Sequence, residues 1–66
     1  MIDEPAARLL KFFQYAHLPD HLQKISAEFK DLAEWSVENV QPGAERTVGL
    51  RKLLEAKDCM VRAQLP

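Results

Sequence analysis

The sequence predicts an all-α fold, in which a short N-terminal helix precedes an antiparallel hairpin of two long helices. Apolar residues recur every three or four positions over two long stretches, which is the period of one helix face. The pair Pro42-Gly43 separates the two stretches, and Pro19 precedes the first of them. Because a connection of only a few residues joins two long helices, we expect them to lie antiparallel.

The chain is long enough for one small domain of 66 residues. We expect four consecutive parts, which are a leader helix and joint at 1–18, a helix at 19–40, a turn at 41–43 and a helix at 44–64. Pro5 suits the first turn of the leader, and Asp3 or Glu4 lies near its positive end. Under three turns long, the leader is unstable alone and must pack on the hairpin.

The joint is rich in aromatic residues, and its side chains fall into two groups. Phe12 and Phe13 are expected to cover the end of the hairpin core. For Tyr15 and His17 the pattern leaves open whether they pack or form one wall of a ligand site. Irregular segments on a rigid scaffold often carry function, so these two side chains are the first candidates for binding.

The first long helix has a clear start and a regular apolar seam. Pro19 disfavours helical geometry at the residue before it, and Asp20 and Gln23 have the spacing of a capping box. The expected seam consists of Leu18, Leu22, Ile25, Phe29, Leu32 and Ser36, and it is widened by Ala33, Val37 and Val40. On the opposite face, Lys30 and Glu34 are placed to pair. Trp35 lies off the seam and is expected to form a second packing surface rather than a ligand platform.

The last helix carries two apolar rows instead of one. The first row is Gly49, Leu53, Ala56, Met60 and Ala63, and the second is Leu50, Leu54 and Val61. A hairpin needs one row for its internal contact, so the other is available to a partner chain. A chain this short buries only about 60% of its unfolded surface and commonly needs additional stabilisation. A single cysteine excludes an internal disulfide, so the sequence predicts a helical homo-oligomer.

Composition excludes several classes of function. Nine basic and ten acidic residues give a net charge of −1, which disfavours DNA or RNA binding and a small DNA-binding regulator in particular. The chain has no apolar run of about 18 residues and an acidic start, so we expect neither a membrane span nor a signal peptide, and a cytoplasmic location.

The sequence also argues against an enzyme. Cys59 is expected to be a structural thiol in the apolar part of the last helix. His17 and His21 are four apart, but Pro19 between them breaks the helix that would align them, so we expect no metal site. The two glycines form no phosphate loop, and the chain offers no catalytic set. We therefore expect no catalysis and no cofactor.

Two cations are left without local partners. Arg46 and Lys57 have no acidic residue three or four positions away on their helix. Unpaired cations near aromatic side chains would suit a small anionic, aromatic ligand. A solvated charged face would give the same pattern.

Four motifs together resemble a known family. They are Phe13-Gln14-Tyr15 followed by Pro19, the turn Gln41-Pro42-Gly43-Ala44-Glu45-Arg46-Thr47, the leucine-rich run 50–58, and Val61-Arg62-Ala63. With these motifs, residues 12–63 resemble the phage anti-CBASS cyclic-oligonucleotide sponges and the hairpin domain shared with phage antagonists of Thoeris defence.

The resemblance implies a compact hexamer of helical hairpins that binds cyclic di- or trinucleotide immune signals and hides them from host effectors without cleaving them. Tyr15 falls on the family's stacking tyrosine and Lys30 on its phosphate-binding basic residue. His17 is a candidate donor to a base edge, although it lies one position later than in nucleotide-binding members, and Pro19 completes the expected site. The expected second pocket contains Arg46, Thr47 and Arg62. The alternative is a helical oligomerisation or protein-interaction module without a small ligand.

Overall fold

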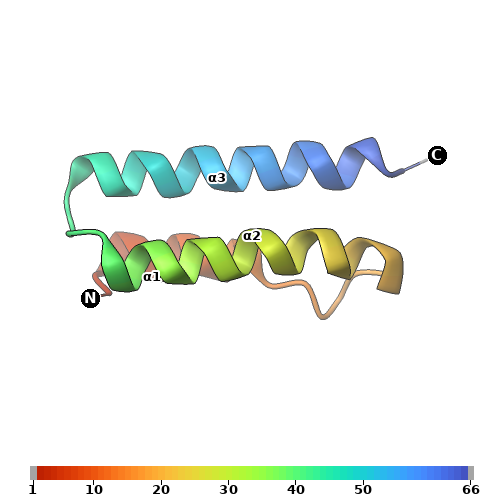
Figure 1. Cartoon of the computed structure of the whole chain (residues 1–66), viewed down its shortest axis with the longest axis horizontal. Helices are drawn as coiled ribbons and strands as arrows, with labels where there is room; N and C mark the ends of the chain where they lie inside the picture. The colour runs from red at the N-terminus through yellow and green to blue at the C-terminus, as the bar shows by residue number, and fades with distance from the viewer. Residues whose placement is uncertain (1, 66) are drawn as a thin grey trace.

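The computed structural model describes residues 2–65 and is all-helical there, which confirms the predicted fold class. Its elements are α1 (Glu4–Leu10), a short 3-10 helix η1 (Lys11–Phe13), α2 (Asp20–Asn39) and α3 (Ala44–Ala63). The two long helices lie side by side and run in opposite directions, and α1 contacts both of them (Figure 1). None of the helices within these residues is long and apolar enough to cross a membrane.

The N-terminal caps of α1 and α2 differ from each other. Asp3 caps α1, because its Oδ1 accepts a hydrogen bond of 3.0 Å from the backbone N–H of Ala6. The predicted capping box at the start of α2 is wrong. Pro19 occupies the N-cap position and offers no side-chain acceptor, while Asp20 is already helical. The amide of Gln23 instead donates to the carbonyl oxygen of Leu18, at 2.8 Å.

The turn between the long helices depends on its glycine. Gly43 has φ 157° and ψ 175°, a backbone conformation that residues with a side chain rarely adopt. The helix α3 begins directly after it, and the Thr47 hydroxyl donates to the carbonyl oxygen of Gly43 at 3.2 Å. Gly43 is therefore what allows so short a reversal between α2 and α3.

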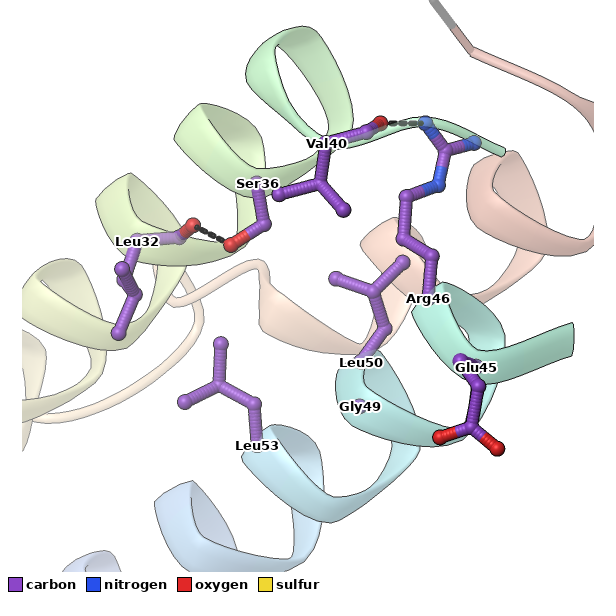
Figure 2. A pocket seen from close by; sticks show the side chains of 8 residues that line it. All are labelled: Leu32, Ser36, Val40, Glu45, Arg46, Gly49, Leu50 and Leu53. Atoms are coloured by element: carbon purple, nitrogen blue, oxygen red, sulfur yellow. Dashed lines mark hydrogen bonds between the residues drawn. The ribbon is translucent and has the colours of Figure 1, made fainter. Parts of the chain in front are cut away.

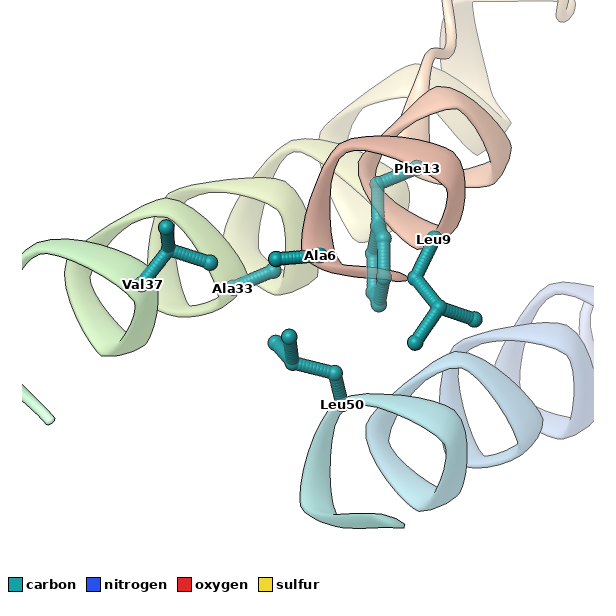
Figure 3. Close-up of a cluster of buried hydrophobic side chains, with 6 residues drawn as sticks. All are labelled: Ala6, Leu9, Phe13, Ala33, Val37 and Leu50. Carbon is teal, nitrogen blue, oxygen red and sulfur yellow. The ribbon is translucent and has the colours of Figure 1, made fainter. Parts of the chain in front are cut away.

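The core is small and lies where α1 and η1 cover the two long helices. Figure 3 shows its six buried side chains, which come from all parts of the fold: Ala6, Leu9, Phe13, Ala33, Val37 and Leu50. Phe13 is fully buried, whereas Phe12 is 63% exposed, so the prediction that both rings cover the core is wrong for Phe12. A 3-10 helix turns by a third of a circle per residue, so only one of two adjacent rings can face inward.

The buried stripe of α2 lies at one edge of the predicted seam, on the side that Ala33 and Val37 were expected to widen. The buried positions are Leu22, Ser26, Ala33 and Val37, while Leu32, a predicted seam residue, is 50% exposed. Both stripes have helical spacing, so periodicity alone cannot distinguish them. The leader decides between them, because α1 and η1 pack on the side that carries Ala33 and Val37.

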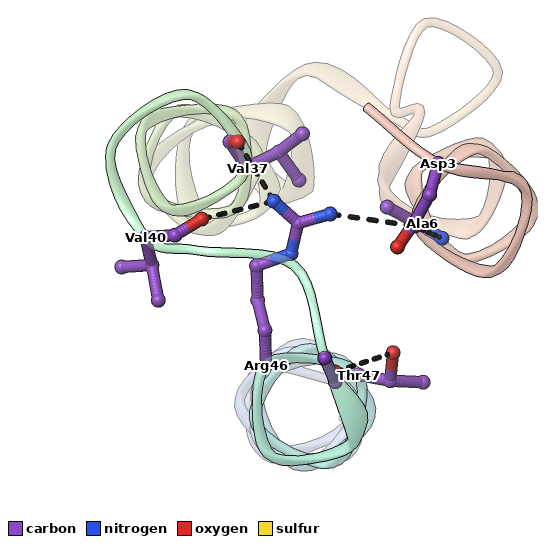
Figure 4. A network of polar contacts seen from close by, with 7 residues as sticks. Asp3, Ala6, Val37, Val40, Arg46 and Thr47 are labelled. Carbon is purple, nitrogen blue, oxygen red and sulfur yellow. Dashed lines mark hydrogen bonds and ion pairs between the residues drawn. The ribbon is translucent and has the colours of Figure 1, made fainter. Parts of the chain in front are cut away.

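Arg46 links all three helices near the turn. It is only 6% exposed, and its Nη1 donates to the carbonyl oxygens of Val37 and Val40, at 3.0 Å each. Its Nη2 lies 3.3 Å from Oδ1 of Asp3, the residue that caps α1 (Figure 4). Arg46 thus satisfies carbonyl groups at the end of α2, where a helix has no internal donors.

Lys57 plays the corresponding part at the other end of the leader. It is 8% exposed, and its Nζ donates to the carbonyl oxygen of Phe12 at 2.9 Å and lies 3.0 Å from Oδ1 of Asp58. The interpretation of Arg46 and Lys57 as cations without partners is therefore corrected, because both bind groups from distant parts of the chain.

Candidate functional site

The joint between η1 and α2 is an irregular segment with defined backbone contacts. The backbone N–H of Leu18 donates to the carbonyl oxygen of Tyr15 at 2.9 Å, which closes a turn. The amide of Gln23 donates to the carbonyl oxygens of Leu18 and Ala16, at 2.8 and 3.5 Å. Within the joint these contacts use backbone groups only, so the side chains of Tyr15, which is half-buried, and His17, which is exposed, take no part in them.

Lys30, which the family resemblance groups with Tyr15, lies on α2. Lys30 projects from α2, and its Nζ forms an ion pair of 3.0 Å with Glu34. The hydrogen bond that Lys30 donates to Glu34 and the charge of that carboxylate raise the pKa of Lys30, and smaller contributions in the same direction come from Tyr15 and Asp31. Tyr15 therefore lies within electrostatic range of the Lys30 ammonium, although no hydrogen bond joins the two side chains among residues 2–65.

A second concave region lies on the other side of the joint, between residues 11–18 and the C-terminal half of α3. This basic pocket has a volume of about 340 Å³. Its lining includes Lys11, Phe12, His17, Lys57 and Arg62. It unites His17 and Arg62, which the sequence placed in different sites. Neither Tyr15 nor Lys30 lines it.

The three residues expected to form one further pocket line three different depressions of the chain. Arg62 lines the basic pocket, and Arg46 lines a groove between α2 and α3. Thr47 lines a third depression, of about 300 Å³, together with Arg8 and Arg51. Pro19 is exposed at the N-cap of α2. One protomer therefore does not assemble Arg46, Thr47 and Arg62 around a single ligand.

An open apolar face runs along α2 and α3 on the side that α1 leaves uncovered. Near the turn it forms a groove of about 370 Å³, whose lining residues are drawn in Figure 2. Toward the other end it continues as a hollow of about 490 Å³. We define this open face by its main apolar side chains, which are Ile25, Phe29, Leu32, Val40, Leu53 and Met60. It contains much of the seam predicted for α2 and part of the first row predicted for α3.

Two residues of the basic pocket were missed as site residues by sequence reasoning. Lys11 has no acidic residue three or four positions away, and that signal was available. The exposure of Phe12 follows only from the geometry of η1. Cys59 is exposed, whereas the sequence predicted a thiol embedded in apolar surroundings. Its Sγ accepts a hydrogen bond of 3.5 Å from Nη2 of Arg62. Within residues 2–65 there is no group of His, Cys, Asp or Glu side chains that would hold a metal ion.

Comparison of the chain with protein-family models, with curated proteins and with solved structures finds no match in any of the three. The function is therefore inferred from the chemistry of the surfaces described above.

Proposed function

We propose that this chain binds a cyclic oligonucleotide and sequesters it without cleaving it. The observation that carries the proposal is that Tyr15, half-buried in the irregular joint, lies within electrostatic range of the Lys30 ammonium. A nucleobase can stack on the tyrosine while a phosphate pairs with the lysine. Stacking of a base on an aromatic side chain contributes roughly 1–3 kcal/mol, so a single copy of the site gives modest affinity.

Two copies of the site would match a cyclic dinucleotide. Such a ligand has two bases, two phosphates and near two-fold symmetry, and a two-fold related pair of protomers presents the same residues twice. The unit of assembly in this proposal is the antiparallel hairpin of α2 and α3, and its open face supplies the contact between copies. The expected state is a homo-oligomer, with the hexamer implied by the family resemblance.

Calorimetric titration of the purified protein with a panel of cyclic di- and trinucleotides tests the proposal. At least one of them should bind saturably and raise the melting temperature. Tyr15→Ala should weaken that binding more than tenfold, since it removes the stacking surface. Tyr15→Phe should retain most of the affinity, because it keeps the ring. Absence of binding across the whole panel would refute the proposal.

The role of Lys30 has a matched control on the same helix. Lys30→Met and Lys24→Met remove the same charge from α2, but Lys24 is exposed and has no assigned role in the site. Only Lys30→Met should weaken the binding of the cyclic nucleotide. Equal affinities for the two variants would refute the assigned phosphate contact.

The open face favours a second candidate function, that of a helical self-association or protein-interaction module without a small ligand. Leu32 and Met60 are half-exposed on this face. Light scattering after size exclusion should show an oligomer at micromolar concentration, and Leu32→Glu should dissociate it. Val48→Glu places the same charge at an exposed apolar residue outside the open face and should leave it intact. A wild-type monomer would contradict both candidate functions.

A further inference from the structure

The basic pocket holds more positive than negative charge. Lys11, Lys57 and Arg62 line it, whereas Asp58 is the one acidic residue in its lining. Within residues 2–65, neither Lys11 Nζ nor the His17 ring has a hydrogen-bond or ion-pair partner, and Arg62 contacts only the sulfur of Cys59. The cations of this pocket are therefore largely unneutralised, and an anion would be attracted to them.

One of these cations is buried and held in place. Lys57 is 8% exposed, and its ammonium is positioned by the carbonyl oxygen of Phe12 and the carboxylate of Asp58. An ammonium group has three N–H donors, and these two partners occupy two of them. The third is available to a phosphate oxygen in the pocket, and its position is set by the fold rather than by a mobile surface side chain.

The pocket also offers an aromatic surface. Phe12 is 63% exposed and lines the same cavity as the cations. An exposed phenylalanine beside lysine and arginine side chains is a platform on which a nucleobase can stack whatever its identity. The amide of Gln14, which also lines the pocket, can donate to or accept from a base edge.

The volume of the pocket limits what it can hold. About 340 Å³ is near the lower end of the range of roughly 300–1,000 Å³ that is usual for ligand sites. One nucleotide unit suits this space better than a cyclic pair of nucleotides. A single phosphate also suits the three cations that line the pocket from η1 and α3.

We infer that the basic pocket is a separate anion site that binds a 5′-mononucleotide. The phosphate is bound by Lys11, Arg62 and the remaining N–H of Lys57, and the base stacks on Phe12. This site does not involve Tyr15 or Lys30 and does not depend on the proposed binding of cyclic oligonucleotides.

Titrations with 5′-AMP and with inorganic phosphate, followed by amide chemical shifts in NMR spectra, test the inference. The wild type should bind 5′-AMP saturably and more tightly than phosphate. The double variant Lys11→Met/Arg62→Met should lower the affinity for 5′-AMP by about tenfold or more, because two charge-assisted contacts are lost. The control Lys24→Met/Lys52→Met, which removes the same charge from exposed sites outside the pocket, should change affinity less than about twofold.

Two further variants separate the parts of the site. Phe12→Ser should reduce 5′-AMP affinity to that of inorganic phosphate and leave phosphate binding unchanged. Tyr15→Ala should leave 5′-AMP binding unchanged, even if it abolishes binding of cyclic nucleotides. The inference is overturned if 5′-AMP does not bind saturably, if it binds no better than phosphate, if both double variants weaken it equally, or if Tyr15→Ala abolishes it.

Discussion

Replacement of Arg46 by methionine should remove a large fraction of the free energy of unfolding of this domain. The guanidinium donates two hydrogen bonds of 3.0 Å to carbonyl oxygens at the end of α2 and pairs with Asp3 at 3.3 Å. Hydrogen bonds to a charged group contribute about 1.5–3 kcal/mol each, and a carbonyl left unsatisfied in the core adds a desolvation cost. Asp3 is about one-third exposed, so its share is reduced by water. The expected loss is about 3 kcal/mol.

That loss is large for a chain of this size. At about 0.05–0.15 kcal/mol per residue, a domain of 66 residues has a free energy of unfolding of roughly 3–10 kcal/mol. Urea unfolding followed by far-UV circular dichroism measures the change. With a slope of about 1 kcal/mol per molar, the midpoint should fall by about 3 M, or the variant should be unfolded without urea. All samples need the same protein concentration, because self-association would add to the apparent stability.

A matched control removes the same charge from the same helix. Arg51 is exposed on α3, and Arg51→Met should change stability by less than about 0.5 kcal/mol. Asp3→Asn keeps the N-cap but removes the ionic partner, so it should cost about 1 kcal/mol or less. If Arg46→Met unfolds at the same urea concentration as Arg51→Met, the assignment of Arg46 as the link between the three helices is refuted.

Three further predictions follow from single side chains. Ser26 is fully buried, and its hydroxyl has no hydrogen-bond partner among the described residues. Ser26→Ala should therefore raise the free energy of unfolding by about 1 kcal/mol, and an unchanged or lower melting temperature would contradict this prediction. Phe13→Ala should cost about 3–5 kcal/mol in urea unfolding, whereas Phe12→Ala should cost less than about 1 kcal/mol; similar losses would contradict the assigned core. Glu34→Gln should lower the pKa of Lys30, which NMR titration measures, and an unchanged pKa would refute this pairing. Because folding raises the pKa of Lys30, the stabilisation by the pair is complete below the ordinary lysine pKa and is lost as the pH rises through the raised value.

Much of the helical architecture was predictable from local chemistry. The helical period of the apolar residues, together with Pro19 and Gly43, predicted the ends of α2 and α3 to within one residue of their positions in the structure. What the pattern could not determine was which stripe of α2 faces inward. Leu32 and Val37 both satisfy helical spacing, and the choice between them depends on where α1 packs, which is a tertiary contact.

The two cations show a similar division between local and tertiary information. The absence of an acidic residue three or four positions from Arg46 and Lys57 correctly marked them as unusual. The partners turned out to be backbone carbonyls and a carboxylate from other elements, because a small domain uses its own polar groups where apolar burial is limited. For Lys11 the same local signal leads to a different outcome, since its side chain has no partner within residues 2–65 and lines a pocket.

The spacing of these contacts determines how the candidate sites are positioned. Arg46 and Lys57 are eleven residues apart on α3, which is about 16 Å at 1.5 Å per residue. Arg46 binds Asp3 and Lys57 binds Phe12. These two partners are nine residues apart, which is about 14 Å along a helical leader. The two lengths are similar, and the long side chains of Arg46 and Lys57 span the remaining difference, so both contacts form in the register that the leader has along α3. That register sets where the joint at 14–18 begins, and with it the positions of both candidate binding surfaces. Lys57 therefore serves the fold and the basic pocket together, which explains why a cation is buried in so small a core.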